Sequence, residues 1–281
     1  MTDITPRLIA PQHACDSHIH IYDRTTPTAP TANGPGPSWA TVSAYRAVQK
    51  RLGTERSVVV QPTAYGTDNR CTVAAIAELG LATTRGVAVI DTSVTDAELR
   101  RLHDAGIRGA RFQMLPGGAL PWQMMEPIAA RIAPLGWHVQ MQMDGRLLAE
   151  REALIARLPC TVVIDHVGKF LEPVPVSHPG FQCLLRLLDR GRVWLKLAAP
   201  YEVSKQPAPL YADVGALARK AVETHPQRMV WASNWPHVAL TTNLPDDAQL
   251  LDLLLDWAPD EATRHRILVE NPATLYQFES F

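Results

Sequence analysis

Four polar side chains stand at the ends of short apolar runs, where residues of their types can act on a substrate. His18 and His20 are separated by one residue in "DSHIH", and a strand would turn both imidazoles to the same face. His166 ends "VVIDH", and Asn234 lies in "WASNWPH", which also carries His237. Because burying polar groups without a task is costly, we interpret this set as a functional site in preference to core packing.

Short runs rich in Val, Ile and Trp alternate with longer stretches of helical period along the 281 residues. This alternation predicts repeated βα units and a parallel sheet. The expected strands are 14–22, 57–64, 85–91, 107–113, 137–143, 160–166, 192–198 and 229–234. The expected helices are about 41–53, 69–80, 95–105, 123–135, 146–158, 177–190, 209–224 and 245–257, with 260–269 and 271–277 as a helical tail. This order predicts an α/β fold, a (β/α)8 TIM barrel, as a single domain over residues 1–281, since such barrels typically have roughly 250 residues.

The place of a polar residue within such a barrel decides how it is interpreted. Active sites of (β/α)8 barrels lie where strands end and βα loops begin, so we expect the histidines and Asn234 at the mouth. The segment 24–38, rich in Pro and Gly, directly follows the first expected strand. It is either a surface linker or a lid over the mouth.

The composition indicates an ordinary globular protein whose partner is a small molecule. Lys and Arg total 27 against 28 Asp and Glu, and no basic run is long enough to follow a nucleic acid. The first residues hold no apolar signal segment and nowhere do 18 apolar residues run together, so we expect a cytoplasmic protein without membrane association. The four scattered cysteines favour reduced, buried thiols over disulfides. The oligomeric state stays open, and a homo-oligomer is possible.

Five short motifs occur in order along nearly the whole chain: "DSHIH", "VQPTAYGTDNR", "GIRGARFQ", "DHVGK" and "WASNWPH". They resemble the amidohydrolase superfamily, specifically its lactonase branch around 2-pyrone-4,6-dicarboxylate lactonase. The first motif alone is weak evidence, whereas five in order on the first, second, fourth, sixth and eighth expected strands are strong evidence. The resemblance implies a barrel enzyme that acts on a lactone.

The resemblance also bears on metal binding. Metal-dependent members of the superfamily hold the ion with the first-strand His pair, a carboxylate or carboxylated Lys on strand four, a His on strand five and an Asp on strand eight. Here strand five offers Gln140 and Gln142, and strand four offers Arg111 and Gln113. Catalytic zinc needs at least three protein ligands, and a guanidinium repels a divalent cation. We therefore expect no metal and no other cofactor.

The lactonase branch hydrolyses without metal, and the resemblance implies catalytic roles. His18, His20 and His166 would donate hydrogen bonds to the lactone carbonyl and the developing oxyanion. The branch's strand-eight Asp takes a proton from the attacking water, and that Asp aligns with Asn234. An amide cannot become a carboxylate, so Asn234 cannot be a general base. Either the chain is an engineered Asp→Asn variant made to trap a substrate, or it is a natural divergent member with another base or a binding role.

The remaining candidates would bind the substrate. By the resemblance, Arg111 and Gln113 face inward and suit a substrate carboxylate, the alternative being that Arg111 pairs with an internal acid. Glu202 stands where the branch has a basic residue, so a lactone with one carboxylate, or one bearing sugar hydroxyls, is favoured over a lactone with two neighbouring carboxylates. Lys169 either offsets this change or is a solvated loop charge. The other predicted substrate contacts are Thr63, Tyr65, Tyr45, Gln142 and His237.

These observations favour a metal-independent hydrolase that acts reversibly on a carboxylated lactone, in the catabolism of aromatic compounds or sugar acids. A sugar-acid lactonase or a lactone isomerase of the same family is an alternative, since a positioned acid and base can also move an acyl group between two hydroxyls. A metal-dependent amidohydrolase or decarboxylase is a further alternative, with Asn234 as a weak oxygen ligand. A barrel that binds a lactone without turnover is the last.

Overall fold

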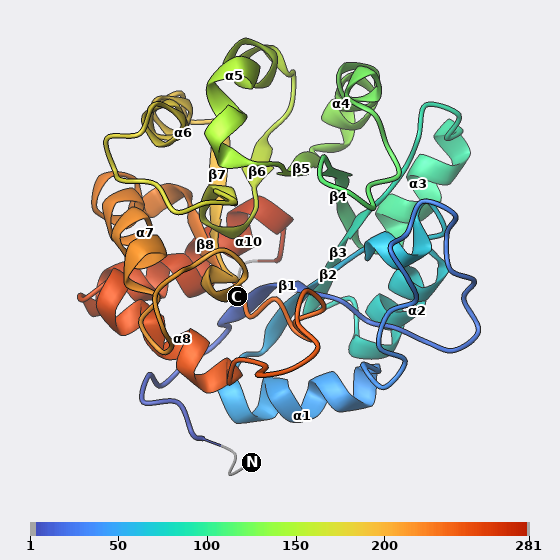
Figure 1. Ribbon diagram of the computed structural model, residues 1–281. Helices are drawn as coiled ribbons and strands as arrows, with labels where there is room; N and C mark the ends of the chain where they lie inside the picture. Colours follow the sequence, from blue (N-terminus) through green and yellow to red (C-terminus); the bar gives the residue numbers. More distant parts are fainter. Residues whose placement is uncertain (1–3, 280–281) are drawn as a thin grey trace.

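In the computed structural model, which describes residues 4–279, eight parallel strands form one sheet in the order β1 to β8. They are β1 (Cys15–Ile19), β2 (Arg56–Val60), β3 (Thr84–Ala88), β4 (Ile107–Gln113), β5 (His138–Gln142), β6 (Val162–Ile164), β7 (Val193–Leu197) and β8 (Met229–Trp231). Figure 1 shows the strands at the centre with the helices around them. The eight predicted strands and the (β/α)8 barrel are confirmed.

The helices between the strands form the outer ring of the barrel. They are α1 (Val42–Leu52), α2 (Arg70–Leu79), α3 (Asp96–Asp104), α4 (Met125–Ile132), α5 (Leu148–Arg157), α6 (Pro179–Asp189), α7 (Ala212–Thr224) and α8 (Asp247–Trp257). Side-chain oxygens of Thr41, Thr95 and Asp246 accept from first-turn amides and cap α1, α3 and α8. The tail comprises α9 (Glu261–His265), a π-helical turn (Arg266–Glu270) and α10 (Asn271–Tyr276). The predicted helices are confirmed, mostly with ends slightly inside the expected bounds.

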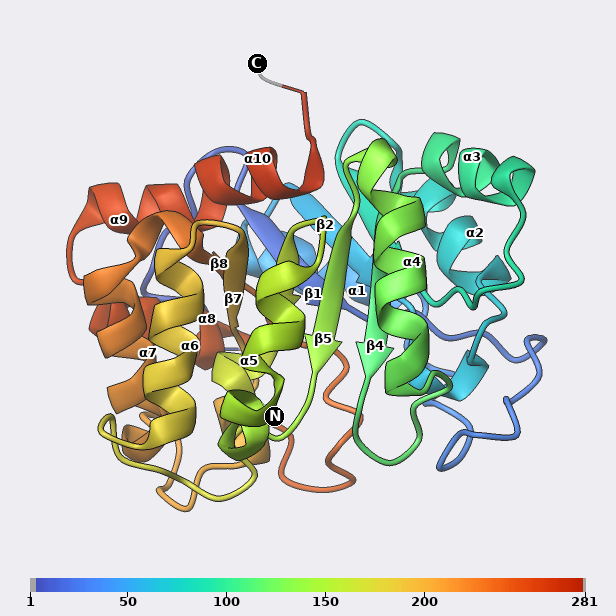
Figure 2. The ribbon, with the colours of Figure 1, turned by 90° about the horizontal axis from the view of Figure 1, so that it is seen from above.

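The inside of the barrel has an apolar layer on the side of the C-terminal tail and a polar layer on the side of the mouth. The apolar layer consists of Cys15, Val58, Val60, Val87, Val163, Trp194 and Val230, which pack against Leu275, Tyr276 and Phe278 of the tail. Figure 2 shows α10 across this end, opposite to the direction in which the β4 and β5 arrows point. The tail therefore closes the end of the barrel opposite to the mouth, and polar groups gather at the mouth.

His18 in β1 and His20 directly after it both turn into this polar layer, as their spacing predicted. Its pairing with β2 shifts register between Asp16 and Ile19. This irregularity breaks the alternation of side chains along β1. Cys15 can therefore belong to the interior apolar layer although it is an odd number of residues away from His18 and His20.

Most of the predicted strands are shorter than expected, and in β6 and β8 the predicted polar ends lie in turns beyond the strand. β6 ends at Ile164, so His166 lies in a 3-10 turn, and β8 ends at Trp231. The segment after β8 closes the barrel, because Asn234 N donates to His18 O at 3.1 Å and His20 N donates to Trp235 O at 2.9 Å. The functional candidates of these two segments therefore sit on turns held by the barrel seam.

The cysteines and the apolar helices were also subjects of the sequence analysis. All four cysteines are buried and free, as their scattered positions predicted. Within residues 4–279, no helix combines the length and the apolar character that crossing a membrane requires. Residues 24–38 contain neither helix nor strand.

Candidate active site

A cavity of about 440 Å³ opens at the mouth of the barrel. A larger hollow of about 670 Å³ lies beside the N-terminal segment, α7 and α8, but no predicted site residue lines it. The mouth cavity is also lined by Tyr22 and by residues 33–37 of the Pro-rich loop. The predicted site residues that line it are His20, Thr63, Arg111, Gln113, Gln142, His166, Lys169, Glu202 and Asn234. The mouth cavity is therefore the candidate active site.

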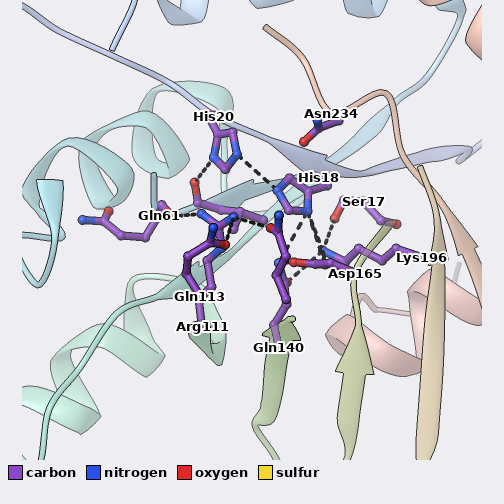
Figure 3. Close-up of polar contacts among 12 residues, drawn as sticks. Ser17, His18, His20, Gln61, Arg111, Gln113, Gln140, Asp165, Lys196 and Asn234 are labelled. Carbon is purple, nitrogen blue, oxygen red and sulfur yellow. Dashed lines mark hydrogen bonds and ion pairs between the residues drawn. The ribbon is translucent and has the colours of Figure 1, made fainter. Parts of the chain in front are cut away.

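The three predicted histidines lie together at this cavity. The Nε2 atoms of His18 and His20 are 3.2 Å apart, and the two rings meet edge to face (Figure 3). His20 Nδ1 is 2.8 Å from the carbonyl oxygen of Val60. The His166 ring lies 5.0 Å from that of His18, centroid to centroid. His18 is fully buried beneath the cavity, so His20 and His166 are the two that line it.

Burial lowers the pKa of all three imidazoles. The pKa of His20 falls to about 3, because burial and then the Arg111 guanidinium disfavour its charged form. Burial and the ammonium of Lys196 hold the pKa of His18 well below its usual range, and burial does the same for His166. Near neutral pH these rings are uncharged, and each has one N–H to donate.

We expect the melting temperature to fall as the pH drops below about 6.5. In the unfolded chain His18, His20, His138 and His166 bind protons at their ordinary pKa. In the folded protein burial lowers the pKa of each ring, that of His138 to about 3, and keeps the ring neutral. Each can cost up to roughly 1.4 kcal/mol of stability per pH unit. Asp16 acts in the opposite sense, because burial raises its pKa to about 6.

Melting curves recorded between about pH 5 and pH 8 measure this effect. His138 lies at the start of β5, away from the mouth, so a His138→Gln variant provides a control that should show a shallower slope. A melting temperature that does not change with pH would contradict the assignment of neutral buried rings.

A buried ammonium that the sequence analysis did not single out lies beside His18. Lys196 Nζ in β7 is 2.9 Å from Ser17 O, 3.2 Å from His18 Nδ1 and 2.8 Å from Gln140 Oε1. Asp165 Oδ1 is 3.6 Å from the same nitrogen. Burial lowers the pKa of Lys196 to about 8 against the opposing effect of Asp165, so the group is charged near neutral pH. A lysine inside the apolar run "RVWLKLA" was the available signal.

The polar layer contains a possible metal-binding cluster, but its residues do not fit a cation. His18, Asp165 and His166 bring one possible ligand atom each to within 4.8 Å of one another. Both ring nitrogens of His18 already have hydrogen-bond partners, and Asp165 forms an ion pair with Lys196. The ammonium would also repel a divalent ion. The cluster of His18, Asp165 and His166 is therefore unsuited to holding a divalent metal ion.

Arg111 presents a buried guanidinium with spare hydrogen-bonding capacity. Its Nη1 donates to Gln61 O at 2.8 Å, and its Nη2 donates to Gln142 Oε1 at 3.1 Å and to Gln113 Oε1 at 3.5 Å. Its Nε has no protein partner, and no carboxylate of residues 4–279 forms an ion pair with it. A buried positive charge without an acid partner is costly and matches an anionic ligand.

Asn234 lies at the cavity with both hydrogens of its amide engaged. Its Nδ2 donates to Tyr201 Oη at 2.8 Å and to Glu202 Oε1 at 2.9 Å. Its backbone is left-handed with φ of 62°, a conformation that asparagine tolerates well. Figure 3 shows the amide oxygen turned toward the side of His18 and His20. An aspartate in this place would lack the two donated hydrogens and would face the carboxylate of Glu202.

Lys169 and Glu202 form an ion pair at the cavity, from the turns that follow β6 and β7. Both side chains are less than a tenth exposed. Burial lowers the pKa of Lys169 to about 8. The ammonium of Lys169 is therefore not a solvated loop charge, and its ion pair with Glu202 neutralises the carboxylate.

Two predicted substrate contacts, Tyr45 and Tyr65, do not line the cavity. Tyr45 is fully buried, and its hydroxyl donates to Asp16 Oδ2 at 3.3 Å. The Tyr65 hydroxyl accepts from Asp23 N and donates to Asp23 O, both at 3.0 Å. The hydroxyls of both tyrosines are therefore turned toward the protein.

His237 also lies outside the cavity lining, behind Asn234. Its Nε2 is 3.0 Å from Asp247 Oδ1, and its Nδ1 is 2.9 Å from Tyr201 Oη. Because a carboxylate only accepts, Nε2 carries the hydrogen and Nδ1 accepts from the tyrosine hydroxyl. The oxygen of Tyr201 then accepts from the Asn234 amide. This chain fixes the orientation of the amide and makes His237 a positioning residue.

The Pro-rich loop 24–38 lies against the βα loops of the mouth. Ala29 N donates to Ala64 O at 2.7 Å after β2, and Asn33 Nδ2 donates to Pro116 O at 3.4 Å after β4. In Figure 1 this loop is the dark blue segment that runs beyond α2. Because residues 33–37 line the cavity, the loop has the position that a lid requires.

A parallel barrel with polar residues converging at its mouth defines an enzyme of the (β/α)8 class. Residues 15–278 match the amidohydrolase family model. The chain belongs to the amidohydrolase family, as the five motifs indicated.

Individual relatives match the chain over nearly its whole length. A D-galactarolactone isomerase of Agrobacterium fabrum is 37% identical over 99% of this chain and 95% of its own. A 2-pyrone-4,6-dicarboxylate hydrolase of Comamonas testosteroni is 36% identical over 96% of this chain and 92% of its own. An apo crystal structure from Agrobacterium tumefaciens has a TM-score of 0.93 at 36% identity, covering 99% of this chain and 100% of that one.

Proposed function

We propose that this protein isomerises a carboxylated, polyhydroxylated lactone by moving the acyl group from one hydroxyl oxygen of the substrate to another. The observation that carries the proposal is Asn234, an amide with both hydrogens engaged where hydrolysis needs a base to activate water. Similarity to a D-galactarolactone isomerase supports it. Isomerisation thereby replaces hydrolysis, which the sequence favoured, as the leading hypothesis.

The histidine cluster would activate the lactone carbonyl. With the carbonyl oxygen placed over this cluster, the N–H of His166 and the Nε2–H of His18, which points at His20 Nε2 in the free protein, donate to it and stabilise the oxyanion that forms on attack. The attacking group is a hydroxyl of the same substrate. Its high effective concentration lowers the barrier in the way that activation of water does in a hydrolase.

Glu202 is the group placed to carry the proton. As the new C–O bond forms, the proton of the attacking hydroxyl passes to the Glu202 carboxylate. Collapse of the tetrahedral intermediate breaks the old ring C–O bond, and Glu202 returns the proton to the released oxygen. Atoms balance without water, and the ion pair with Lys169 holds the carboxylate in place.

The charges around the cavity indicate which lactone fits. Arg111 lines the cavity and offers a buried cation for one carboxylate of the substrate. Glu202 and the amide oxygen of Asn234 are acceptors, which suits hydroxyl groups and repels a second carboxylate at their end of the cavity. A sugar-acid lactone with one free carboxylate meets both conditions.

Hydrolysis is the second candidate, because Glu202 is a carboxylate in the cavity that is able to take a proton from water as well. Galactaric acid lactone in ¹⁸O-water separates the two reactions. We expect ring isomers to interconvert by ¹³C NMR without ¹⁸O in their carbonyl groups, and a Glu202→Gln variant to slow this roughly 10²–10⁴-fold. Glu172→Gln, at an exposed glutamate, is the matched control and should leave the rate unchanged. Rapid release of ¹⁸O-labelled open-chain acid would instead establish a hydrolase.

A further inference from the structure

The partners of the histidine pair determine where each ring hydrogen lies. The carbonyl oxygen of Val60 can only accept, so Nδ1 of neutral His20 carries the hydrogen and its Nε2 accepts. His18 Nε2, 3.2 Å from that acceptor, must therefore donate. Neutral His18 then has no hydrogen on Nδ1, and the Lys196 ammonium donates to that nitrogen at 3.2 Å.

The surroundings of Lys196 hold it in this one arrangement. Its ammonium has three hydrogens and three acceptors within 3.2 Å: Ser17 O, His18 Nδ1 and Gln140 Oε1. The orientation of Gln140 is fixed in turn, because its Nε2 donates to Asp165 Oδ2 at 3.1 Å. An ammonium has no acceptor, so His18 Nδ1 cannot gain a hydrogen without losing its bond to Lys196. Figure 3 shows these side chains converging from β5, β7 and the first strand.

Asp165 acts on His18 in the opposite sense. Its Oδ1 is 3.5 Å from His18 Nδ1 and has no hydrogen-bond partner of its own. Without the ammonium, the neighbours of Nδ1 would be this carboxylate and Gln140 Nε2 at 3.4 Å. Of the two, the charged carboxylate would draw the ring hydrogen to Nδ1. His18 Nε2 would then be an acceptor and would face the acceptor nitrogen of His20. The tautomer of His18 thus depends on competition between Lys196 and Asp165.

We propose that Lys196 is a positioning residue that fixes His18 in its Nε2–H tautomer, keeps that donor aimed at His20 at the floor of the cavity, and excludes divalent cations from the cluster of His18, Asp165 and His166. The ammonium supplies the fixed positive charge beside the histidine pair without coordinating the substrate. The consequence for catalysis rests on the proposed function. The tautomer and the exclusion of cations do not, because both are measurable without a substrate.

Histidine side-chain ¹⁵N NMR of the whole protein tests the proposal. In the parent protein we expect His18, assigned with a His18→Gln variant, to show a protonated Nε2 and an unprotonated Nδ1. In Lys196→Met the pattern should reverse, and the variant should bind one zinc ion in a calorimetric titration in which the parent binds none. Val163→Ala, in the apolar layer below, is the control for packing damage. It should lower the melting temperature and leave the His18 signals unchanged.

Activity gives a further measurement. Lys196→Met should lower kcat for isomerisation by about 10²–10³-fold, as expected for loss of one oxyanion donor, with a much smaller change in KM. An Nδ1–H tautomer of His18 in the parent protein would overturn the proposal even if no Lys196 variant folds. Unchanged His18 signals and no zinc binding in Lys196→Met would overturn it as well. If the tautomer reverses but the parent isomerises no lactone, the proposed function fails and the role of Lys196 stands.

Discussion

The Asn234→Asp variant is expected to hydrolyse lactones at least about 10²-fold faster than the parent chain. An aspartate has nearly the same shape as asparagine, and it supplies the proton acceptor for water that the amide lacks. A positioned general base typically contributes about 10²–10⁴ in rate. The release of open-chain acid measures hydrolysis, and ring interconversion in the same sample measures isomerisation. The ratio of the two rates should shift toward hydrolysis.

The neighbours of residue 234 make the pH dependence of this variant informative. Asn234 Nδ2 is 2.9 Å from Glu202 Oε1, so an aspartate there would bring two carboxylates within hydrogen-bond distance. Like charges this close raise the apparent pKa of the pair, and the ammonium of Lys169 opposes the effect. Hydrolysis by Asn234→Asp should therefore need a higher pH than hydrolysis by the double variant Asn234→Asp with Glu202→Gln.

The hydrolysis rates of an alanine control and of the two aspartate variants decide whether residue 234 is the place where water is activated. Asn234→Ala removes the amide without adding a base, so it is the control that should gain no hydrolysis. If neither aspartate variant gains hydrolysis, position 234 is not the place where this barrel activates water. That result would also contradict the hypothesis that the chain is an engineered Asp→Asn form of a hydrolase.

The barrel was predictable because its strands are short apolar runs that end in polar residues. An apolar run of a few residues between two stretches of helical period is a local property of the sequence, so each strand was visible in its own few residues. The positions of His20, His166, Arg111 and Asn234 at the mouth followed from the same pattern, since three of them stand just beyond strand ends and Arg111 two residues before the end of β4. Resemblance of the motifs then pointed to the chemistry.

The partners of these residues were not predictable in the same way. Lys196 meets His18 across the inside of the barrel, 178 positions away along the chain, so their contact depends on the register of strands that are not neighbours. The hydroxyls of Tyr45 and Tyr65 turn toward the protein because of local hydrogen bonds, which no periodicity in the sequence describes. Sequence patterns indicate which layer a residue occupies, and they leave its bonding partners undetermined.

Replacing Arg111 by Met is expected to weaken binding of a carboxylated lactone by roughly 2–5 kcal/mol, or about 30-fold to several thousandfold. The guanidinium is buried and has no acid partner among the described residues, so its match is the carboxylate of the ligand. Arg111→Lys keeps the charge but loses the planar fork that binds a carboxylate through two bonds. It should give an intermediate loss, seen mainly in KM.

Two further measurements separate carboxylate binding by Arg111 from a purely structural role: binding of a lactone without the carboxylate, and the stability of the ligand-free protein. A lactone whose carboxylate is converted to a neutral amide should bind poorly to the parent protein and lose little more in Arg111→Met, because both changes remove the same interaction. Removing a buried charge without an acid partner should also raise the melting temperature of the ligand-free protein. A stabilised protein that still binds the carboxylated lactone as tightly as the parent would show that Arg111 contributes only to the fold.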